Sequence, residues 1–383
     1  MREPKMHWRF ETARWMALAL AVTLSTGCAT APRGQSANPL DLQLQARGLD
    51  PAAVTVPYAL DDTMRAWAHT VAPPELGELD RLEALVEALL DNGELELEYS
   101  WGYTGTAQEV FLEHRANCLA FTNLFVGLAR EVGVPVFFLA VETETFRKHE
   151  DFVVVSDHIA VAYRTGLAAG KDVRMYDFSE NPGQELAKVR PISDLTAIAM
   201  FHSNRGAEAL QRGDLVSALD WLRLAVAIDP DMANGWLNLG VARRRAGDLE
   251  GAEMAYKRSL EIDPRTYPAY QNLATMLHAQ GRTDEAQDFQ EALQRSPNRN
   301  PYSYLSLGDI SFRSGRWTEA RRFYRRAARL ETDGAEPYAA LGHLAAVEGD
   351  FETARRMLRK AMRLDRNEPR TQRLANLVAS PSG

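Results

Sequence analysis

The strongest constraint in this sequence is a pattern that returns every 34 residues across its C-terminal half. One slot of the pattern holds His202 and then four rings at equal intervals: Trp236, Tyr270, Tyr304 and Tyr338. Four residues after that slot stands a glycine, replaced once by Ala274: Gly206, Gly240, Gly308 and Gly342. A further small residue keeps the same interval: Ala218, Ala252, Ala286, Ala320 and Ala354. Five copies in register predict a stack of similar units rather than one globular core.

This period and pattern resemble the tetratricopeptide repeat, a pair of antiparallel helices in which small residues let the two helices touch. The resemblance implies an all-α solenoid of five repeats over residues 197–383, with PRTQRLANLVAS as a C-terminal capping helix. Each predicted hairpin turn carries a glycine: Gly213, Gly247, Gly281, Gly315 and Gly349.

Such an array usually presents a concave groove that binds peptide. Three amides stand 34 residues apart at the sixth position of the first three repeats, namely Asn204, Asn238 and Asn272. A ladder of amides can hydrogen-bond the backbone of an extended chain whatever its side chains are. We therefore predict a peptide-binding groove at these residues. In the alternative interpretation the asparagines face water.

The N-terminus has the features of an export signal. Basic residues precede the apolar run WMALALAVTL, which is too short to span a membrane as a helix. The following LSTGC resembles the lipobox of bacterial lipoproteins, which implies cleavage after residue 27 and lipidation of Cys28. The alternative is an ordinary secretory signal. Residues 28–57 are small, polar and proline-bearing, and predict a flexible tether.

The middle region, residues 58–196, reads as an α+β domain. A strongly apolar helix is predicted from Asn117 or Cys118 to Gly133, and its composition is that of a buried helix. Three strand candidates follow, at residues 135–142, 158–164 and 172–178. A buried helix followed by antiparallel strands is typical of the α+β class.

Cys118 opens the predicted helix, where unpaired N–H groups and the helix dipole favour a thiolate. His158 opens the second strand candidate and Asp177 lies in the third, so neighbouring strands could hold an imidazole beside a carboxylate. That arrangement would supply a base for the thiol and a group that orients the base. In the alternative interpretation, Cys118 is a small buried hydrophobic residue.

The strings ANCLAFTNLFVGLAREVGVPV, DHIAVAY and YDFSEN resemble the transglutaminase-like superfamily, which is related to papain-type cysteine proteases. The resemblance implies Cys118 as nucleophile, His158 as general base and acid, and Asp177 as the orienting group. The implied reaction is acyl transfer through a thioester, with the Cys118 N–H among the oxyanion donors.

Several further residues are candidates for this site. Tyr103 is a candidate second oxyanion donor, with Trp101 as its alternative, and either could simply pack. His114 could share a zinc ion with Cys118, but no complete ligand set is evident, so we predict no metal and no cofactor. His149 is the rival to His158 as the base.

The formal charge is acidic, with 44 basic and 52 acidic residues, which disfavours nucleic acid as a partner. Together these features predict a cysteine hydrolase or acyltransferase of the bacterial cell envelope. It would be an outer-membrane lipoprotein facing the periplasm, held by its N-terminal lipid, whose repeats bind a polypeptide substrate or partner. The alternative is a non-catalytic lipoprotein scaffold in which the repeats mediate protein-protein interaction.

Overall fold

The computed structural model describes residues 38–91, 95, 97–100, 102–141, 146–149, 152–155, 158–165, 172–178, 189–296 and 300–379. The chain forms two compact units. The first contains residues 1–145 and 156–238, and the second contains residues 146–155 and 239–383. The predicted signal segment, Cys28 and Trp101 lie outside the described residues.

The tether predicted over residues 28–57 does not extend to its expected end. From residue 38 onward the chain is folded, with helix α1 (Pro39–Gln45) and a short 3-10 helix, η1 (Pro51–Ala53). Leu44 is fully buried and packs in a cluster with Leu195 and Ile198. The segment is polar overall but contains a few apolar side chains, and their burial stabilises its fold within the first unit.

The N-terminal part of the first unit is organised around one buried helix, α5 (Cys118–Glu131). Its flanking elements are α2 (Asp62–Val71), α3 (Glu78–Val86), the π-helical turn η2 (Glu87–Asp91) and α4 (Ala107–Glu113). Every residue from Leu119 to Ala129 is buried. The predicted central helix is confirmed, since a helix that is apolar all round needs neighbours on every face.

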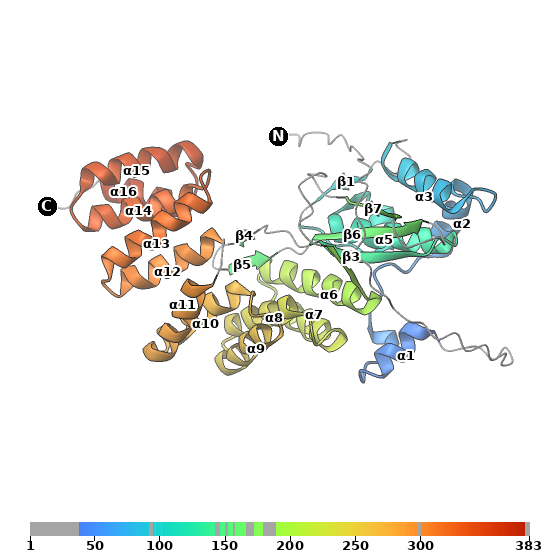
Figure 1. Ribbon diagram of the computed structural model, residues 1–383, viewed down its shortest axis with the longest axis horizontal. Helices are drawn as coiled ribbons and strands as arrows, with labels where there is room; N and C mark the ends of the chain where they lie inside the picture. The colour runs from blue at the N-terminus through green and yellow to red at the C-terminus, as the bar shows by residue number, and fades with distance from the viewer. Residues whose placement is uncertain are drawn as a thin grey trace. The chain divides into compact units, whose positions relative to one another are not determined.

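A four-stranded antiparallel sheet packs against α5, in the order β7-β6-β3-β8. Figure 1 labels β7, β6 and β3 beside α5. Its strands are β3 (Val136–Val141), β6 (His158–Thr165), β7 (Asp172–Tyr176) and β8 (Val189–Ile192). Alternate residues such as Phe138 and Val161 join the core around α5, whereas Leu139 and Ala160 form a second cluster. The three predicted strands are present, with β8 added from a segment that sequence reasoning left unassigned.

Two smaller strand pairs complete the β-structure of the described residues. The parallel pair joins β1 (Glu98–Tyr99) to β2 (Arg115–Ala116), and the antiparallel pair joins β4 (Phe146–His149) to β5 (Phe152–Val155). The first pair fixes the chain immediately before α5. The second belongs to the second compact unit.

The C-terminal half is built of five helical hairpins and a last helix, as the 34-residue period predicts (Figure 1). The first three pairs are α6 (Asp194–Gln211) with α7 (Leu215–Ile228), α8 (Ala233–Arg245) with α9 (Leu249–Ile262), and α10 (Tyr267–Ala279) with α11 (Thr283–Arg295). The remaining elements are α12 (Pro301–Arg313), α13 (Trp317–Leu330), α14 (Ala335–Val347), α15 (Phe351–Leu364) and α16 (Pro369–Ala379). The boundary predicted at residue 197 falls inside α6, and α6 and α7 belong to the first compact unit.

Two kinds of glycine explain why the repeats keep their period. The five predicted turn glycines all have positive φ, for example +77° at Gly281, which glycine adopts without strain. At Gly308 an added Cβ would overlap the ring of Tyr324, so the small residue is what lets α12 and α13 approach. Among the described residues, no helix combines the length and the apolar character needed to cross a membrane.

Candidate functional site

The first candidate site is the N-terminus of α5, where Cys118 is the first helical residue. Asn117 caps this helix because its side-chain oxygen accepts the backbone N–H of Ala120 at 2.9 Å. Cys118 is half-buried and its thiol is free. The predicted start of the helix is therefore confirmed, and the cysteine lies at the end of the helix where backbone N–H groups are unpaired.

A buried network holds the loop that precedes this helix end. The Asn117 amide donates to the Thr104 hydroxyl at 2.6 Å, and the Thr104 backbone N–H donates to the Glu208 carboxylate at 2.7 Å. Arg205 donates to the Thr104 carbonyl at 3.2 Å. Burial raises the pKa of Glu208 above the ordinary value for a glutamate. Arg205 and Glu208 lie on α6, so the first repeat helix fixes the loop beside Cys118.

The sequence alone did not predict that Arg205 and Glu208 hold the loop before Cys118. Glu208 and Thr104 are 104 positions apart, and nothing in a 34-residue period points to a contact outside the array. The available signal was a carboxylate on an otherwise apolar stretch of α6, since Glu208 is buried between Ala207 and Ala209. A buried charged side chain normally has a specific partner.

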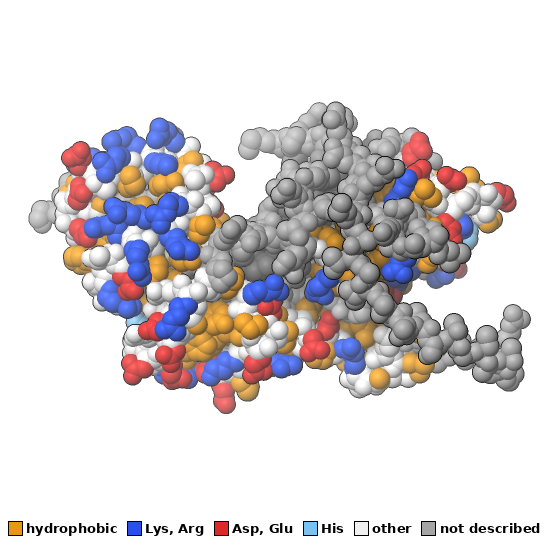
Figure 2. All heavy atoms as spheres, viewed as in Figure 1, with side chains coloured by type: hydrophobic (Ala, Val, Ile, Leu, Met, Phe, Trp, Pro, Cys, Tyr) orange, Lys and Arg blue, Asp and Glu red, His pale blue; other side chains and the backbone are white. Residues whose placement is uncertain are grey.

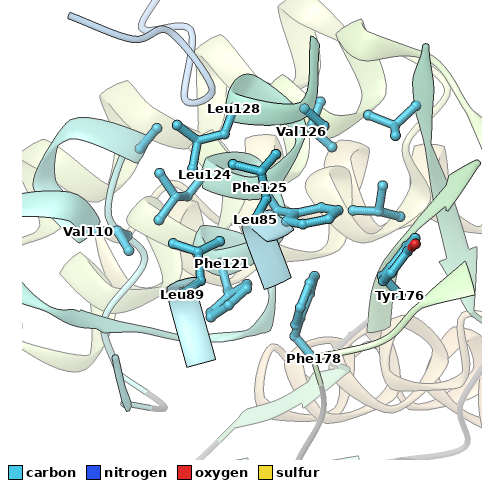
Figure 3. Packing of buried hydrophobic residues seen from close by; sticks show 14 of the residues in the cluster. Leu85, Leu89, Val110, Phe121, Leu124, Phe125, Val126, Leu128, Tyr176 and Phe178 are labelled. Atoms are coloured by element: carbon cyan, nitrogen blue, oxygen red, sulfur yellow. The ribbon is translucent and has the colours of Figure 1, made fainter. Parts of the chain in front are cut away.

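The strand register brings the backbone of His158 and Asp177 toward the same end of the core. His158 begins β6 opposite Val141, and Val161 stands opposite Tyr176, so the residues that follow β7 run beside the start of β6. The rings of Phe178 and Phe121 lie 4.0 Å apart, which places the first turn of α5 at that end too (Figure 3).

The side chains of this constellation are only partly described. Asp177 is half-buried, and the side chain of His158 lies outside the described residues. The rival His149 lies on β4, again with only its backbone described. The triad therefore stays a prediction that the backbone topology accommodates.

Tyr103 lies beside the α5 N-terminus, but its ring has another neighbour. Its carbonyl accepts the Asn117 N–H at 3.2 Å, and the Arg115 guanidinium lies 4.4 Å from the ring centre. Burial, helped by the nearby Glu109 carboxylate, raises the pKa of Tyr103 to about 12. The phenol is therefore neutral near pH 7, and its role as an oxyanion donor stays a prediction.

His114, the candidate zinc ligand, is the C-cap of α4. It is exposed and has the left-handed φ of 55°. Across the described ranges, no group of three or more His, Cys, Asp or Glu side chains is placed to hold a metal ion.

The second candidate site is a cavity of about 300 Å³ in the second compact unit. Its lining comes from α8, α10, α12 and α16: Arg244, Gln271, Asn272, Thr275, Tyr302, Leu305, Ser306, Asp309, Arg313 and Arg370. Asn272 is only 5% exposed, and its amide nitrogen has no hydrogen-bond partner among the described residues. The side-chain oxygen of Gln271 is unpartnered in the same way. An unpaired buried amide is costly, so these atoms mark a place where a ligand can bond.

One wall of this cavity is held by a charged network. Arg370 donates to both carboxylate oxygens of Asp309, at 2.7 and 2.5 Å, and its Nε lies 2.8 Å from Glu336. The Tyr324 hydroxyl also donates to Asp309, at 2.8 Å. Arg370 is thus neutralised within the protein, and the two carboxylates raise its pKa.

The three asparagines predicted as one ladder differ in their surroundings. Asn272 lines the cavity just described. Asn204 and Asn238 belong to the first compact unit. The Asn238 amide donates to the Ser203 hydroxyl at 3.0 Å, so its nitrogen already has a partner within the protein. Asn204 is half-buried.

Models of the tetratricopeptide repeat family match residues 231–296, residues 273–335, and the segments 199–223 and 335–360. The C-terminal region consists of tetratricopeptide repeats. These matches leave residues 58–196 uncovered, and the comparisons give the transglutaminase-like assignment no support. The search of curated proteins finds no match to this chain.

Several solved structures match about half of this chain. PilF of Pseudomonas aeruginosa is 22% identical, with a TM-score of 0.41, over 47% of this chain and 82% of that one. TTC0263 of Thermus thermophilus is 20% identical, with a TM-score of 0.42, over 48% of this chain and 100% of that one. YrrB, a repeat protein described as having an unusual peptide-binding site, is 16% identical, with a TM-score of 0.34, over 46% and 92%.

Proposed function

We propose that the repeats of this protein bind a polypeptide partner and that the cavity beside Asn272 holds part of it. The observation that carries this proposal is the pair of unpartnered buried amide atoms, the nitrogen of Asn272 and the oxygen of Gln271. One donates and the other accepts, which is what the backbone of an extended peptide requires. The cavity volume of about 300 Å³ suits a short segment rather than a folded domain.

Site-specific photo-crosslinking in the intact protein tests this function. A benzophenone amino acid replaces Ser306, which lines the cavity, or Lys257, which is exposed on α9. We expect a polypeptide adduct from position 306 only, reduced at least about tenfold by Asn272→Leu, which removes the donor. Gln287→Leu, an exposed amide on α11, is the matched control. Equal adducts from both positions, or no effect of Asn272→Leu, would contradict the binding of a polypeptide in this cavity.

A second function, acyl transfer by Cys118, is supported by a separate observation. The free thiol lies at a helix N-terminus, and the backbones of His158 and Asp177 approach the same end of the core. In this proposal the thiolate attacks a carboxamide or peptide carbonyl, the amine leaves, and a thioester forms. Water or a second amine then releases the acyl group. The resemblance of the Cys118, His158 and Asp177 segments to the transglutaminase-like superfamily is part of this second proposal.

Alkylation of Cys118 over a range of pH tests the second function. We expect Cys118 to be alkylated rapidly at pH 7, and the rate to fall in His158→Ala. His149→Ala tests the rival base: it should leave the rate unchanged if His158 is the base, and a loss in His149→Ala instead would assign that role to His149. A Cys118 thiol that reacts only above pH 9 in every variant would contradict catalysis and support the non-catalytic scaffold.

The cellular location is proposed from the N-terminal sequence alone. We infer that Cys28 carries the lipid of an envelope lipoprotein. Metabolic labelling with a palmitate analogue should mark the wild-type chain and not Cys28→Ser, while Cys118→Ser should label normally. Label that persists in Cys28→Ser would contradict this location.

A further inference from the structure

The second helices of the last two repeats carry basic residues at five equivalent positions. Each residue of α13 has a counterpart 34 positions later on α15: Arg321 and Arg355, Arg322 and Arg356, Arg325 and Arg359, Arg326 and Lys360, Arg329 and Arg363. We name these ten residues the basic array. Positions four apart on a helix share a face, so each helix presents one broad cationic face. Figure 2 shows Lys and Arg side chains gathered over these repeats.

The repeat fold does not require this charge. The preceding second helix, α11, carries other residues at the five equivalent positions: Gln287, Asp288, Glu291, Ala292 and Arg295. That helix also has an ion pair between Arg295 and Glu291, at 2.5 Å. The basic array is therefore a property of the last two repeats, imposed on a framework that tolerates acidic and neutral residues there.

Only a minority of the array is neutralised within the protein. Arg321 pairs with Glu348, and Arg322 lies 3.9 Å from Glu319. Five exposed arginines form no ion pair with the described residues: Arg325, Arg329, Arg355, Arg359 and Arg363. Like charges held in rows repel one another, so an external polyanion would lower the electrostatic free energy of this surface.

Exposed apolar side chains accompany these arginines. Leu330 and Leu364 occupy equivalent positions at the C-terminal ends of α13 and α15, and they are 39% and 36% exposed. Trp317 is 42% exposed and stands one turn before Arg321. Guanidinium groups bind phosphate with two parallel hydrogen bonds, while exposed leucine and tryptophan are typical of the membrane interface.

We propose that the basic array docks on a membrane surface rich in anionic phospholipid. The array supplies the attraction to the phosphates, and the apolar side chains enter the headgroup layer. Nucleic acid fits less well, because successive bases need a row of exposed rings. Tyr304 and Tyr338 beneath the array are buried, which leaves Trp317 as a single exposed ring beside Arg321. This surface is distinct from the groove cavity, so the proposal goes beyond partner binding and does not depend on it.

Vesicle sedimentation with the full chain tests the proposal, with Cys28→Ser as background so that acylation cannot contribute. The probes are vesicles of phosphatidylcholine alone and of phosphatidylcholine mixed with phosphatidylglycerol. We expect binding to the mixed vesicles only, lost as sodium chloride is raised. The triple variant Arg325→Gln, Arg359→Gln, Arg363→Gln should bind about 100-fold more weakly, at about fivefold for each charge near the surface.

A matched control removes the same charge from arginines that are already paired. Arg258, Arg265 and Arg295 are each in an ion pair with a nearby acidic side chain, and the triple glutamine variant at these positions should bind like the background chain. Equal loss in both triple variants, or equal binding to neutral vesicles, overturns the proposal. Equally strong retention on duplex DNA or polyglutamate would also overturn the assignment to lipid.

Discussion

The α+β domain around α5, residues 58–196, and the repeats of the second compact unit reach a packed interior by different routes. In the domain, contacts join residues far apart in sequence, such as Phe121 with Phe178, and Thr104 bonds to Glu208 on the first repeat helix. In the repeats, contacts are local, such as Gly308 beneath the ring of Tyr324, and they recur with the period. The stability of the domain therefore depends on individual long-range contacts. The stability of the repeats is spread over equivalent contacts in successive hairpins.

The largest effect should come from emptying the centre of the domain. Phe125 is fully buried, and its ring lies 5.3 Å from Tyr176 and 5.4 Å from Phe178 (Figure 3). We expect Phe125→Ala to lower the free energy of unfolding by about 3–5 kcal/mol in denaturant titrations. Leu112→Ala, at a residue 76% exposed on α4, should change it by less than about 0.5 kcal/mol. Comparable losses from the two variants would contradict the central role of α5.

A pH-dependent effect should come from the first repeat. His202 is fully buried and donates from Nε2 to the Thr55 carbonyl at 3.1 Å, and burial lowers its pKa to about 4. The folded state then binds fewer protons than the unfolded state below pH 6.5. Stability relative to His202→Gln should fall as pH drops from about 6.5 to 4, by about 3 kcal/mol. Parallel pH profiles for the two proteins would show that His202 is not the titrating group.

A smaller loss should follow from removing the acceptor on α6. Glu208→Leu leaves the buried Thr104 N–H unpaired, at a cost of about 1–3 kcal/mol. Faster hydrogen exchange at Thr104 and Asn117 should accompany the loss. Glu208→Gln keeps an acceptor oxygen and should recover most of it. If Gln behaves like Leu, the charge rather than the hydrogen bond holds the loop.

The smallest effect should come from a repeat turn. Gly281 has a φ of +77°, and no atom lies within 4 Å of the position of an added Cβ. Gly281→Ala should therefore cost only backbone strain, about 1 kcal/mol by thermal unfolding. Gly281→Asn should cost less, because asparagine tolerates this conformation. A loss of stability several times larger would mean that the turns, and not only the contacts between helices, determine the stability of the repeats.

The same contrast explains how much could be predicted from sequence. The number of repeats, their turns and the capping helix were predictable from the sequence. The residues that contact one another in a hairpin lie within one 34-residue period, so the pattern shows them directly. In the domain, the start of α5 at Cys118 and the three strands were also predictable from local patterns. The Thr104–Glu208 bond was not, because no local pattern encodes a partner 104 residues away.

The candidate sites divide in a similar way. Asn272 was predicted from its slot and lines a cavity, whereas Arg370 in the same wall comes from the capping helix, whose residues carry no repeat signature. The folded segment from residue 38 to residue 57 was missed because its few apolar residues have no period. The basic array was visible as a 34-residue spacing, but the overall acidic charge concealed it.

The attachment of α16 through Arg370 has a consequence for degradation. Linear stacks of helices fray from their ends, which is where proteases begin. Arg370 ties the last helix to α12 and α14 together, through Asp309 and Glu336. Detaching this end exposes two carboxylates that face each other without their shared cation. The hold of α16 on its neighbours therefore combines this shared guanidinium with the burial of Leu374, and loss of either should speed proteolysis of this helix.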